Sequence, residues 1–291
     1  MASMREIKSR ITATKKTAQI TKAMHMVSAS KLKKAERSMK SYRPLMHQLR
    51  EMIDNLLDSD TLLSHPMLVE RESNHVCYIL VSSDRGLAGP YNSSVFKEFM
   101  SYVKEHHQSD DEFTVATIGY KAYSFAKRMN YKMLNTEVIN VRDDIQFIDF
   151  KSVTEAFMMD FLKGKIDRII VFYNHFINTI SQRVEHQQIL PVTNGRVHEE
   201  TEKGLNIIYN YEPSPQIIIN HLLPMYVENT LYGMILDAKA SEHASRMTAM
   251  KSATDNADEV IHSLQLHYNR ARQAAITIEL TDIIGGANAV N

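Results

Sequence analysis

Residues 234–284 read MILDAKASEHASRMTAMKSATDNADEVIHSLQLHYNRARQAAITIELTDII, a run with no glycine and no proline. A continuous helix over this run would be about 75 Å long, at roughly 1.5 Å per residue. Small and apolar residues recur along it at helical spacing: Met250, Ala253, Ala257, Ile261, Leu264, Tyr268, Ala271, Ala275 and Ile278. A helix this long cannot bury its stripe on an ordinary small core, so the run predicts a second long helix as its partner.

The other end of the chain supplies a matching pattern, because residues 1–43 also lack glycine and proline. Their seam alternates steps of four and three, which is typical of a coiled coil. It comprises Ile7, Ile11, Thr14, Ala18, Thr21, His25, Ser28, Leu32, Ala35, Met39, Tyr42, Met46, Leu49, Ile53 and Leu56. The two ends are therefore predicted to pair as a long antiparallel coiled coil, with a bend expected at Pro44. Many seam residues are small, so a surrounding partner is expected to add burial.

Between these ends, short apolar runs alternate with helical spacing, which predicts a mostly parallel sheet with helical crossovers. Strands are predicted at 75–82, 113–118, 132–141 and 168–173, followed by an antiparallel extended segment at 177–190 and a short one at 206–211. Helices are predicted at 93–107, 120–129 and 152–163, and the last long helix is expected to stop at Gly285 and Gly286. The predicted fold class is α/β, with three parts: residues 1–58 and 216–291 form the coiled coil, and residues 59–215 form an inserted Rossmann-like domain.

Charge is balanced over the 291 residues, with 34 basic and 34 acidic side chains, but it is unevenly distributed. Residues 1–50 carry thirteen lysines and arginines against Glu6 and Glu36, a net charge of about +11. A basic segment of this kind favours an anionic partner, either nucleic acid, a lipid surface or an acidic protein. Cys77 is the single cysteine, which excludes a disulfide framework and fits a reducing compartment. No apolar run is long enough for a transmembrane helix, and no secretory signal is evident.

The loop at residues 82–92, SSDRGLAGPYN, follows a predicted buried strand, where a dinucleotide fold would hold a phosphate. Gly86 and Gly89 match neither the dinucleotide nor the P-loop spacing, so a structural turn or a protein-contact loop is favoured. The thirteen histidines show no ligand spacing. His25 on the seam sets the register, contacts a partner at an interface, or merely occupies the edge of the seam. No catalytic residue, cofactor site or metal site is predicted.

Four segments resemble the gamma subunit of bacterial rotary (F-type) ATP synthases. ITKAMHMVSASKL at 20–32 is similar to the family's N-terminal helix, and SDRGLAG at 83–89 to the loop after its first strand. ASEHASRMTAMKSATDNA at 240–257 and YNRARQAAITIELTDIIGGANA at 268–289 resemble its C-terminal helix and terminal signature. Ala88 stands where the family often has cysteine. No redox-regulatory insertion of the chloroplast kind is seen, which favours a bacterial form.

The resemblance implies a non-catalytic central-stalk rotor, turning inside a ring of alpha and beta subunits and coupling proton-driven rotation of the c ring to ATP synthesis or hydrolysis. It implies contacts with the alpha/beta ring at Met24, Asp84, Arg85, Gly86, Arg272 and Gln273. Tyr211 and Glu212 are expected near the c ring and the epsilon subunit. The implied location is the cytoplasmic side of the bacterial inner membrane, peripheral and held through the complex. Nucleotide would bind to the partners and not to this chain.

Two other functions compete with this interpretation. A nucleic-acid-binding protein would use the basic helix, but residues 1–41 lack the aromatic side chains that stack on bases. A nucleotide-binding enzyme would use the Rossmann-like domain, but its glycine loop is incomplete. Salt-sensitive DNA binding or nucleotide binding by the isolated chain would favour one or the other.

Overall fold

The computed structural model describes residues 4–58, 65–71, 75–192 and 212–290. They divide into two compact units. The first unit comprises residues 1–29 and 246–291, and the second comprises residues 30–245. Helix α1 (Met4–Asp58) and helix α5 (Pro215–Val290) each contribute to both units.

The predicted seam of α1 is confirmed, because every one of its residues is buried or half-buried while most intervening residues are exposed. Within the second unit, Tyr42 of α1 donates a hydrogen bond to Asn229 of α5, and Lys31 and His243 both contact Asp143. The residue number on α5 falls as the number on α1 rises, so the two helices are antiparallel, as predicted. The α1 helix continues through Pro44, and α5 continues through Pro224.

The body of the second unit is a four-stranded sheet in the order β2-β1-β3-β4. Its strands are β1 (Val76–Val81), β2 (Phe113–Ile118), β3 (Arg168–Phe176) and β4 (Gln182–Leu190). The first three are parallel, with Val76 opposite both Phe113 and Arg168, and β4 runs antiparallel to β3. The central strand β1 is buried along its whole length, as its continuous apolar sequence predicts. Cys77 is fully buried there, and burial raises the pKa of its thiol to about 12.

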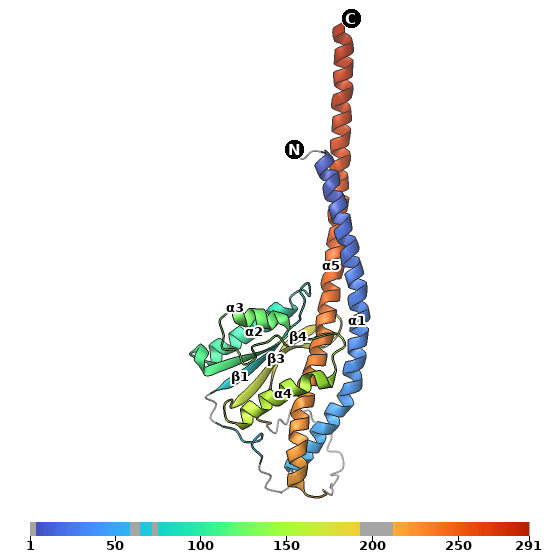
Figure 1. The fold of residues 1–291 in the computed structure, drawn as a ribbon. Helices are drawn as coiled ribbons and strands as arrows, with labels where there is room; N and C mark the ends of the chain where they lie inside the picture. The colour runs from blue at the N-terminus through green and yellow to red at the C-terminus, as the bar shows by residue number, and fades with distance from the viewer. Residues whose placement is uncertain (1–3, 59–64, 72–74, 193–211, 291) are drawn as a thin grey trace. The chain divides into compact units, whose positions relative to one another are not determined.

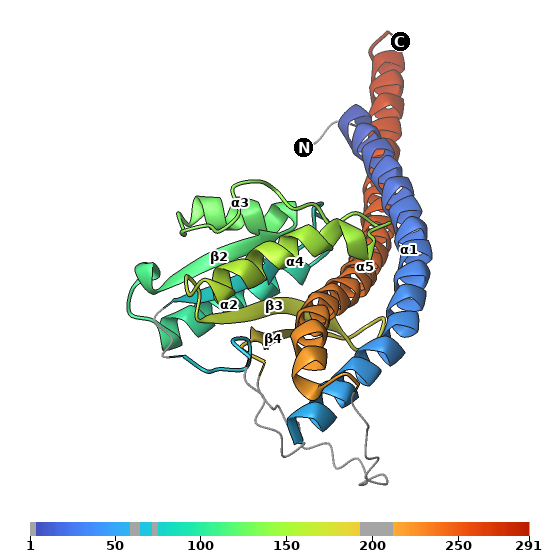
Figure 2. The same cartoon turned by 60° about the horizontal axis from the view of Figure 1, so that its bottom comes forward.

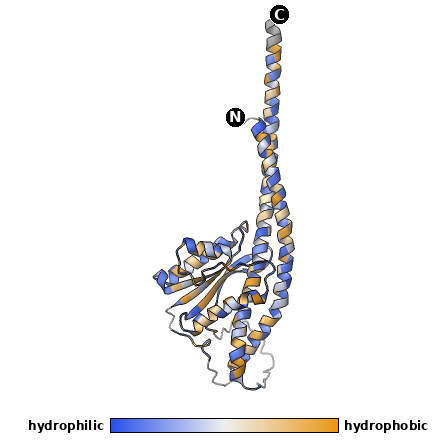
Figure 3. Cartoon of the chain, in the orientation of Figure 1, coloured by the Kyte–Doolittle hydropathy of each residue, from blue (hydrophilic) through white to orange (hydrophobic). Residues whose placement is uncertain are grey.

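Helices cover both faces of this sheet (Figures 1 and 2). On one face lie α2 (Tyr91–His106) and α3 (Tyr120–Arg128), whose apolar side chains pack on Tyr78 and Phe172. A short 3-10 turn (Asp110–Glu112) precedes β2. The other face packs on α4 (Phe147–Leu162) and on parts of α1 and α5. Apolar residues mark the inner strands of the sheet, and they alternate with polar residues along the helices (Figure 3). The α/β body with its long helices is confirmed.

The strand predicted at 132–141 is wrong. That segment makes isolated bridges at Met133 and Ile139 to β2 and no continuous ladder. The side chain of Asn135 takes the place of a strand partner. Its Oδ1 accepts the backbone N–H of Thr117 at 2.8 Å, and its Nδ2 donates to the Thr117 carbonyl at 3.2 Å. Because a side-chain amide satisfies this edge of β2, the backbone of the segment is free to turn away.

The predicted stop at Gly285 and Gly286 is also wrong, because α5 continues through both residues to Val290. A glycine inside a helix costs about 1 kcal/mol relative to alanine, and does not by itself end the helix. The extended segment predicted at 206–211 lies outside the described residues.

The first unit is a helical pair formed by residues 4–29 of α1 and the part of α5 after Ser245. Three of its buried seam positions carry small side chains, Ala18, Ser28 and Ala257, and two carry larger ones, Ile7 and Met250. Thr21 and Thr254 share a hydrogen bond of 2.7 Å between their hydroxyl groups. This seam therefore removes little apolar surface from water, and each contact contributes little hydrophobic free energy.

Candidate functional site

The loop after β1 occupies the position in the sheet where an α/β protein would bind a nucleotide. The connection after β1 leads to β2 on one side, and the connection after its neighbour β3 leads to β4 on the other side, so the two connections leave in opposite directions. Ligands of open α/β sheets bind at such a switch point. The structure therefore tests directly whether the loop at 82–90 can hold a phosphate.

The polar groups of this loop are used within the chain. The hydroxyl of Ser82 accepts the backbone N–H of Ala122 at the start of α3, at 2.7 Å. The carboxylate of Asp84 accepts two backbone N–H groups, from Tyr120 at 3.0 Å and from Val141 at 2.8 Å. Free N–H groups at helix N-termini are what an incoming phosphate would need. In this chain, side chains of the loop already accept hydrogen bonds from two of them.

The close approach of the loop to α3 depends on Gly119. Its backbone has φ +95, a conformation that side chains strongly disfavour. A Cβ atom placed there would lie 2.2 Å from the Ser82 carbonyl oxygen. The glycine at this switch point therefore serves contact between two segments of the protein.

Helix α5 covers the space beside the loop. The Tyr91 hydroxyl donates to the Ala238 carbonyl at 3.0 Å, and the Ser245 hydroxyl donates to the Ala88 carbonyl at 2.7 Å. At the end of β3, the Asp237 carboxylate contacts the His175 ring and accepts the Phe176 N–H at 3.0 Å. Burial raises the pKa of Asp237, and His175 offsets part of that effect. These contacts attach α5 to the body beside the loop.

The tip of the loop is exposed at Arg85, Gly86 and Leu87. Leu87 is 65% exposed, and its backbone is in the left-handed region at φ 62. An exposed leucine in a conformation that costs about 1–2 kcal/mol is unusual for a structural turn. Sequence reasoning named Arg85 and Gly86 but missed Leu87, although its place between Gly86 and Gly89 was a signal of a tight turn.

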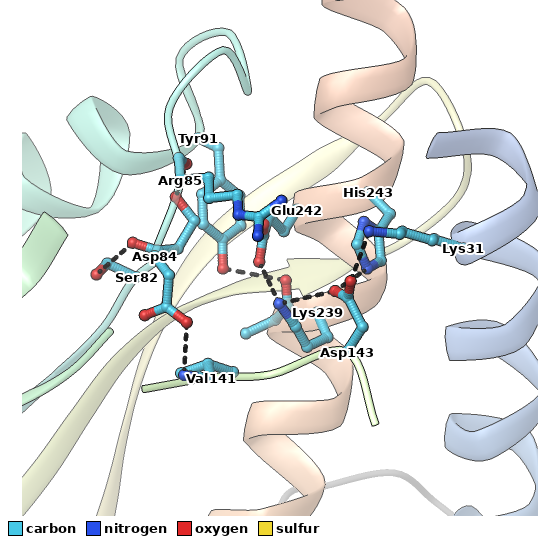
Figure 4. Close-up of polar contacts among 12 residues, drawn as sticks. Lys31, Ser82, Asp84, Arg85, Tyr91, Val141, Asp143, Lys239, Glu242 and His243 are labelled. Carbon is cyan, nitrogen blue, oxygen red and sulfur yellow. Dashed lines mark hydrogen bonds and ion pairs between the residues drawn. The ribbon is translucent and has the colours of Figure 1, made fainter. Parts of the chain in front are cut away.

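A second group of polar side chains lies nearby and is centred on Asp143, in the segment between α3 and α4 (Figure 4). Its carboxylate contacts Lys31 at 2.6 Å, His243 at 3.1 Å and Lys239 at 3.3 Å. Lys239 also pairs with Glu242 at 3.0 Å. We call Lys31, Asp143, Lys239, Glu242 and His243 the Asp143 cluster. Partial burial works to raise the pKa of Asp143, but the Lys31 hydrogen bond and the charges of Lys239 and His243 outweigh it and hold that pKa well below its usual range.

No sequence pattern indicated the Asp143 cluster. Its members come from α1, from a loop and from α5, and no local pattern connects residues so far apart in the chain. The segment at 140–146 carries several charges of both signs, which was the one available signal.

The predicted contacts of the helical unit lie at two separate levels. Met24 is half-buried and lies one turn from Thr21, whereas Arg272 and Gln273 are exposed. Thr21 faces Thr254, and Arg272 lies eighteen residues beyond Thr254, a helical rise of about 27 Å. The structure therefore does not bring Met24 next to Arg272 within this chain.

Glu212 is exposed and lies just before α5 begins at Pro215, while Tyr211 lies outside the described residues. Across the parts of the chain that the structure describes, no three histidine, cysteine or acidic side chains are grouped to hold a metal ion. In the same residues, no helix combines the length and apolar character needed to cross a membrane.

This architecture is similar to that of known proteins. A family model described as ATP synthase matches residues 3–290. Among solved structures, a chain of the Tetrahymena thermophila mitochondrial ATP synthase central stalk and c-ring is 24% identical, with a TM-score of 0.58. That match covers 80% of this chain and 99% of the other.

Two Euglena gracilis mitochondrial ATP synthase structures are also similar. A chain of the rotor in rotational state 1 is 17% identical over 94% of this chain and 98% of its own length, with a TM-score of 0.67. A chain of the OSCP, F1 and c-ring assembly in rotational state 3 is 18% identical over 99% and 94%, with a TM-score of 0.70. At these identities the structures establish the shared fold, and the family match covers almost the whole sequence. The chain therefore belongs to the gamma-subunit family of F-type ATP synthases, the non-catalytic subunits of the central stalk.

Proposed function

We propose that this gamma subunit is the shaft of a rotary ATP synthase and couples rotation of a c ring to catalysis in a ring of alpha and beta subunits. The observation that carries the proposal is the last part of α5. Large apolar side chains stand exposed along it: Val260, Leu266, Ile276, Ile278, Leu280, Ile283 and Ile284. Exposed apolar residues gathered on one element mark a protein interaction surface. Partner subunits that surround the helix would bury these apolar side chains.

Charge supports the same partner. The first turns of α1 present exposed basic side chains, including Lys8, Lys15, Lys16 and Lys22. A basic surface of this kind attracts an acidic protein surface and steers the orientation of binding. We propose contacts of Met24, Arg272 and Gln273 with the surrounding ring, at the two levels of the helical unit described above. The exposed loop tip, with Arg85 and Gly86, offers a further contact to a neighbouring subunit, and Asp84 holds that tip in place.

The body is proposed as the foot of the shaft. In this division of labour, residues 1–58 and 216–291 form the rotor helices and residues 59–215 form the foot. Tyr211 and Glu212 would then lie near the c ring and the epsilon subunit. We propose a bacterial enzyme at the cytoplasmic side of the inner membrane, with this chain peripheral and held through its partners. The absence of a redox-regulatory cysteine insertion in the sequence supports that source.

A rotation experiment tests the proposal. Alpha and beta subunits of the same source are immobilised, this chain is assembled with them, and a probe is attached to an introduced cysteine at exposed Ser93. ATP is expected to drive continued rotation of the probe in one direction. A stable complex that hydrolyses ATP while the probe stays fixed would contradict the proposal. A cysteine in the immobilised ring, carrying the same probe, is the matched control.

A further inference from the structure

The carboxylate of Asp143 lies between the two long helices and contacts both. Its Oδ2 atom faces α1 and meets Lys31 Nζ at 2.6 Å. Its Oδ1 atom faces α5 and meets His243 Nε2 at 3.1 Å and Lys239 Nζ at 3.3 Å. One side chain of the body therefore contacts both helices, one with each oxygen (Figure 4).

The side chains that contact Asp143 from α5 are more deeply buried than the one that contacts it from α1. The side chains of Lys239 and His243 are 9% and 4% exposed, whereas those of Lys31 and Asp143 are about 40% exposed. An ion pair in water is worth little, but removing one partner of a buried charge leaves that charge poorly compensated. Without the Asp143 carboxylate, Lys239 would keep Glu242 as its described carboxylate partner.

The contact of Asp143 with Lys31 lies far along α1 from the apolar contacts of that helix with the body core. The apolar contacts of α1 with the body core are at Leu49, Ile53 and Leu56. Lys31 lies eighteen residues before Leu49, a rise of about 27 Å along the helix. A helix attached at two levels resists turning and tilting against the body far better than a helix attached at one. Lys31 also lies one residue after Ser30, where the second compact unit begins on α1.

We infer that Asp143 is a positioning residue for energy coupling: it fastens both rotor helices to the foot, so that a turn of the foot turns the shaft without slip. This inference rests on the proposed rotor function. Asp143 touches no substrate and no reacting atom. Its effect is expected on the work transmitted for each ATP, and not on the chemistry at the catalytic sites.

The test uses the full complex in sealed vesicles, with ATP hydrolysis and ATP-driven proton uptake measured together. Asp143→Asn keeps the shape of the side chain and removes its charge. It should leave hydrolysis nearly unchanged and lower proton uptake per ATP several-fold against an imposed gradient. Asp144→Asn is the matched control, because Asp144 is the neighbouring carboxylate and pairs with exposed Arg142 at 2.8 Å. The control should behave as wild type, and Asp143→Glu should restore part of the coupling.

A second variant removes the α1 side alone. Lys31→Met should reproduce the loss of coupling, with Lys33→Met, an exposed position on the same helix, as its control. The double variant Asp143→Asn with Lys31→Met should be no worse than Asp143→Asn alone, because both changes break one contact. If Asp143→Asn fails to assemble, Lys31→Met decides the question.

The outcomes separate two failures. Wild-type coupling in Asp143→Asn and Lys31→Met, or an equal loss in the two controls, would overturn the role of Asp143 while the rotor function stands. A parallel loss of hydrolysis and pumping would show a merely structural residue. A wild-type complex that hydrolyses ATP but pumps no protons would overturn the rotor proposal itself, and this inference with it.

Discussion

The two compact units of this chain differ in how much of their own stability they supply. The second unit has a sheet covered on both faces, with large side chains such as Phe99, Phe161 and Phe172 fully buried. The first unit is two helices joined along a seam of small residues, with apolar side chains left exposed on α5. One chain can therefore combine a body that is stabilised by its own core with helices whose exposed apolar side chains are buried by other subunits.

The largest effect is expected from a core residue of the second unit. Phe161→Ala removes a fully buried ring that packs under the Arg71 guanidinium, 4.9 Å from its carbon to the ring centre. The free energy of unfolding of the chain should fall by about 3–5 kcal/mol. Denaturant unfolding followed by circular dichroism measures it. Met159→Ala, at an exposed position of the same helix, should change stability by no more than about 0.5 kcal/mol. Equal effects would show that the body is not held by this core.

A smaller, pH-dependent effect is expected at Asp143. Because its pKa is lower in the folded chain than the usual value of about 4, the carboxylate stabilises the fold at neutral pH. That stabilisation is present above pH about 4 and is lost as the pH falls through the lowered pKa. Solvent screens this half-exposed group, so Asp143→Asn should cost only about 1 kcal/mol at pH 7.

Unfolding curves at pH 7 and at about pH 3 check this prediction. The difference between wild type and Asp143→Asn should shrink at the acid pH. A difference that grows on acidification would reverse the sign and remove the electrostatic explanation.

The first unit should respond differently, because its exposed residues are expected to face partners. Arg272→Ala should change the unfolding free energy of the isolated chain by less than about 0.5 kcal/mol, since the side chain is exposed. In the assembled complex it should lower ATP synthesis more than ATP hydrolysis. Arginine offers several donors to a carboxylate, and such a charge-assisted bond is worth about 1.5–3 kcal/mol. Arg270→Ala is the control two residues away. Unchanged ratios of synthesis to hydrolysis in reconstituted vesicles would place the contact elsewhere.

The smallest effect is expected when ATP is added to the isolated chain. Ser82 and Asp84 already accept N–H groups at the switch point, and α5 covers it, so the isolated chain should give no heat of ATP binding in titration calorimetry. Ser245→Ala, which removes one contact of α5 with the loop, serves as a second chain for the same titration. Micromolar affinity in either chain would revive the nucleotide-binding interpretation.

Much of the fold could be predicted because its signals are periodic and local. The seam of α1 follows the heptad pattern, and β2 begins and ends where the apolar run at 113–118 does. The two incorrect predictions concern places where a single side chain or the end of a helix determines the backbone structure. Asn135 replaces a strand partner of Thr117, and the glycines at 285 and 286 do not stop α5. The Asp143 cluster could not be predicted, because tertiary packing alone brings Lys31, Asp143 and His243 together.

A surrounding partner is expected to complete the burial of the helical unit, whereas the body needs no such partner. Amide hydrogen exchange of the full chain, alone and in complex with alpha and beta subunits, tests this expectation directly. In the chain alone, residues 4–29 and 246–284 should exchange much faster than β1 and β3. In the complex, these helical segments should become strongly protected, with little change in the strands. Helical segments that are as protected as β1 in the isolated chain, or equally exposed in both states, would contradict the account.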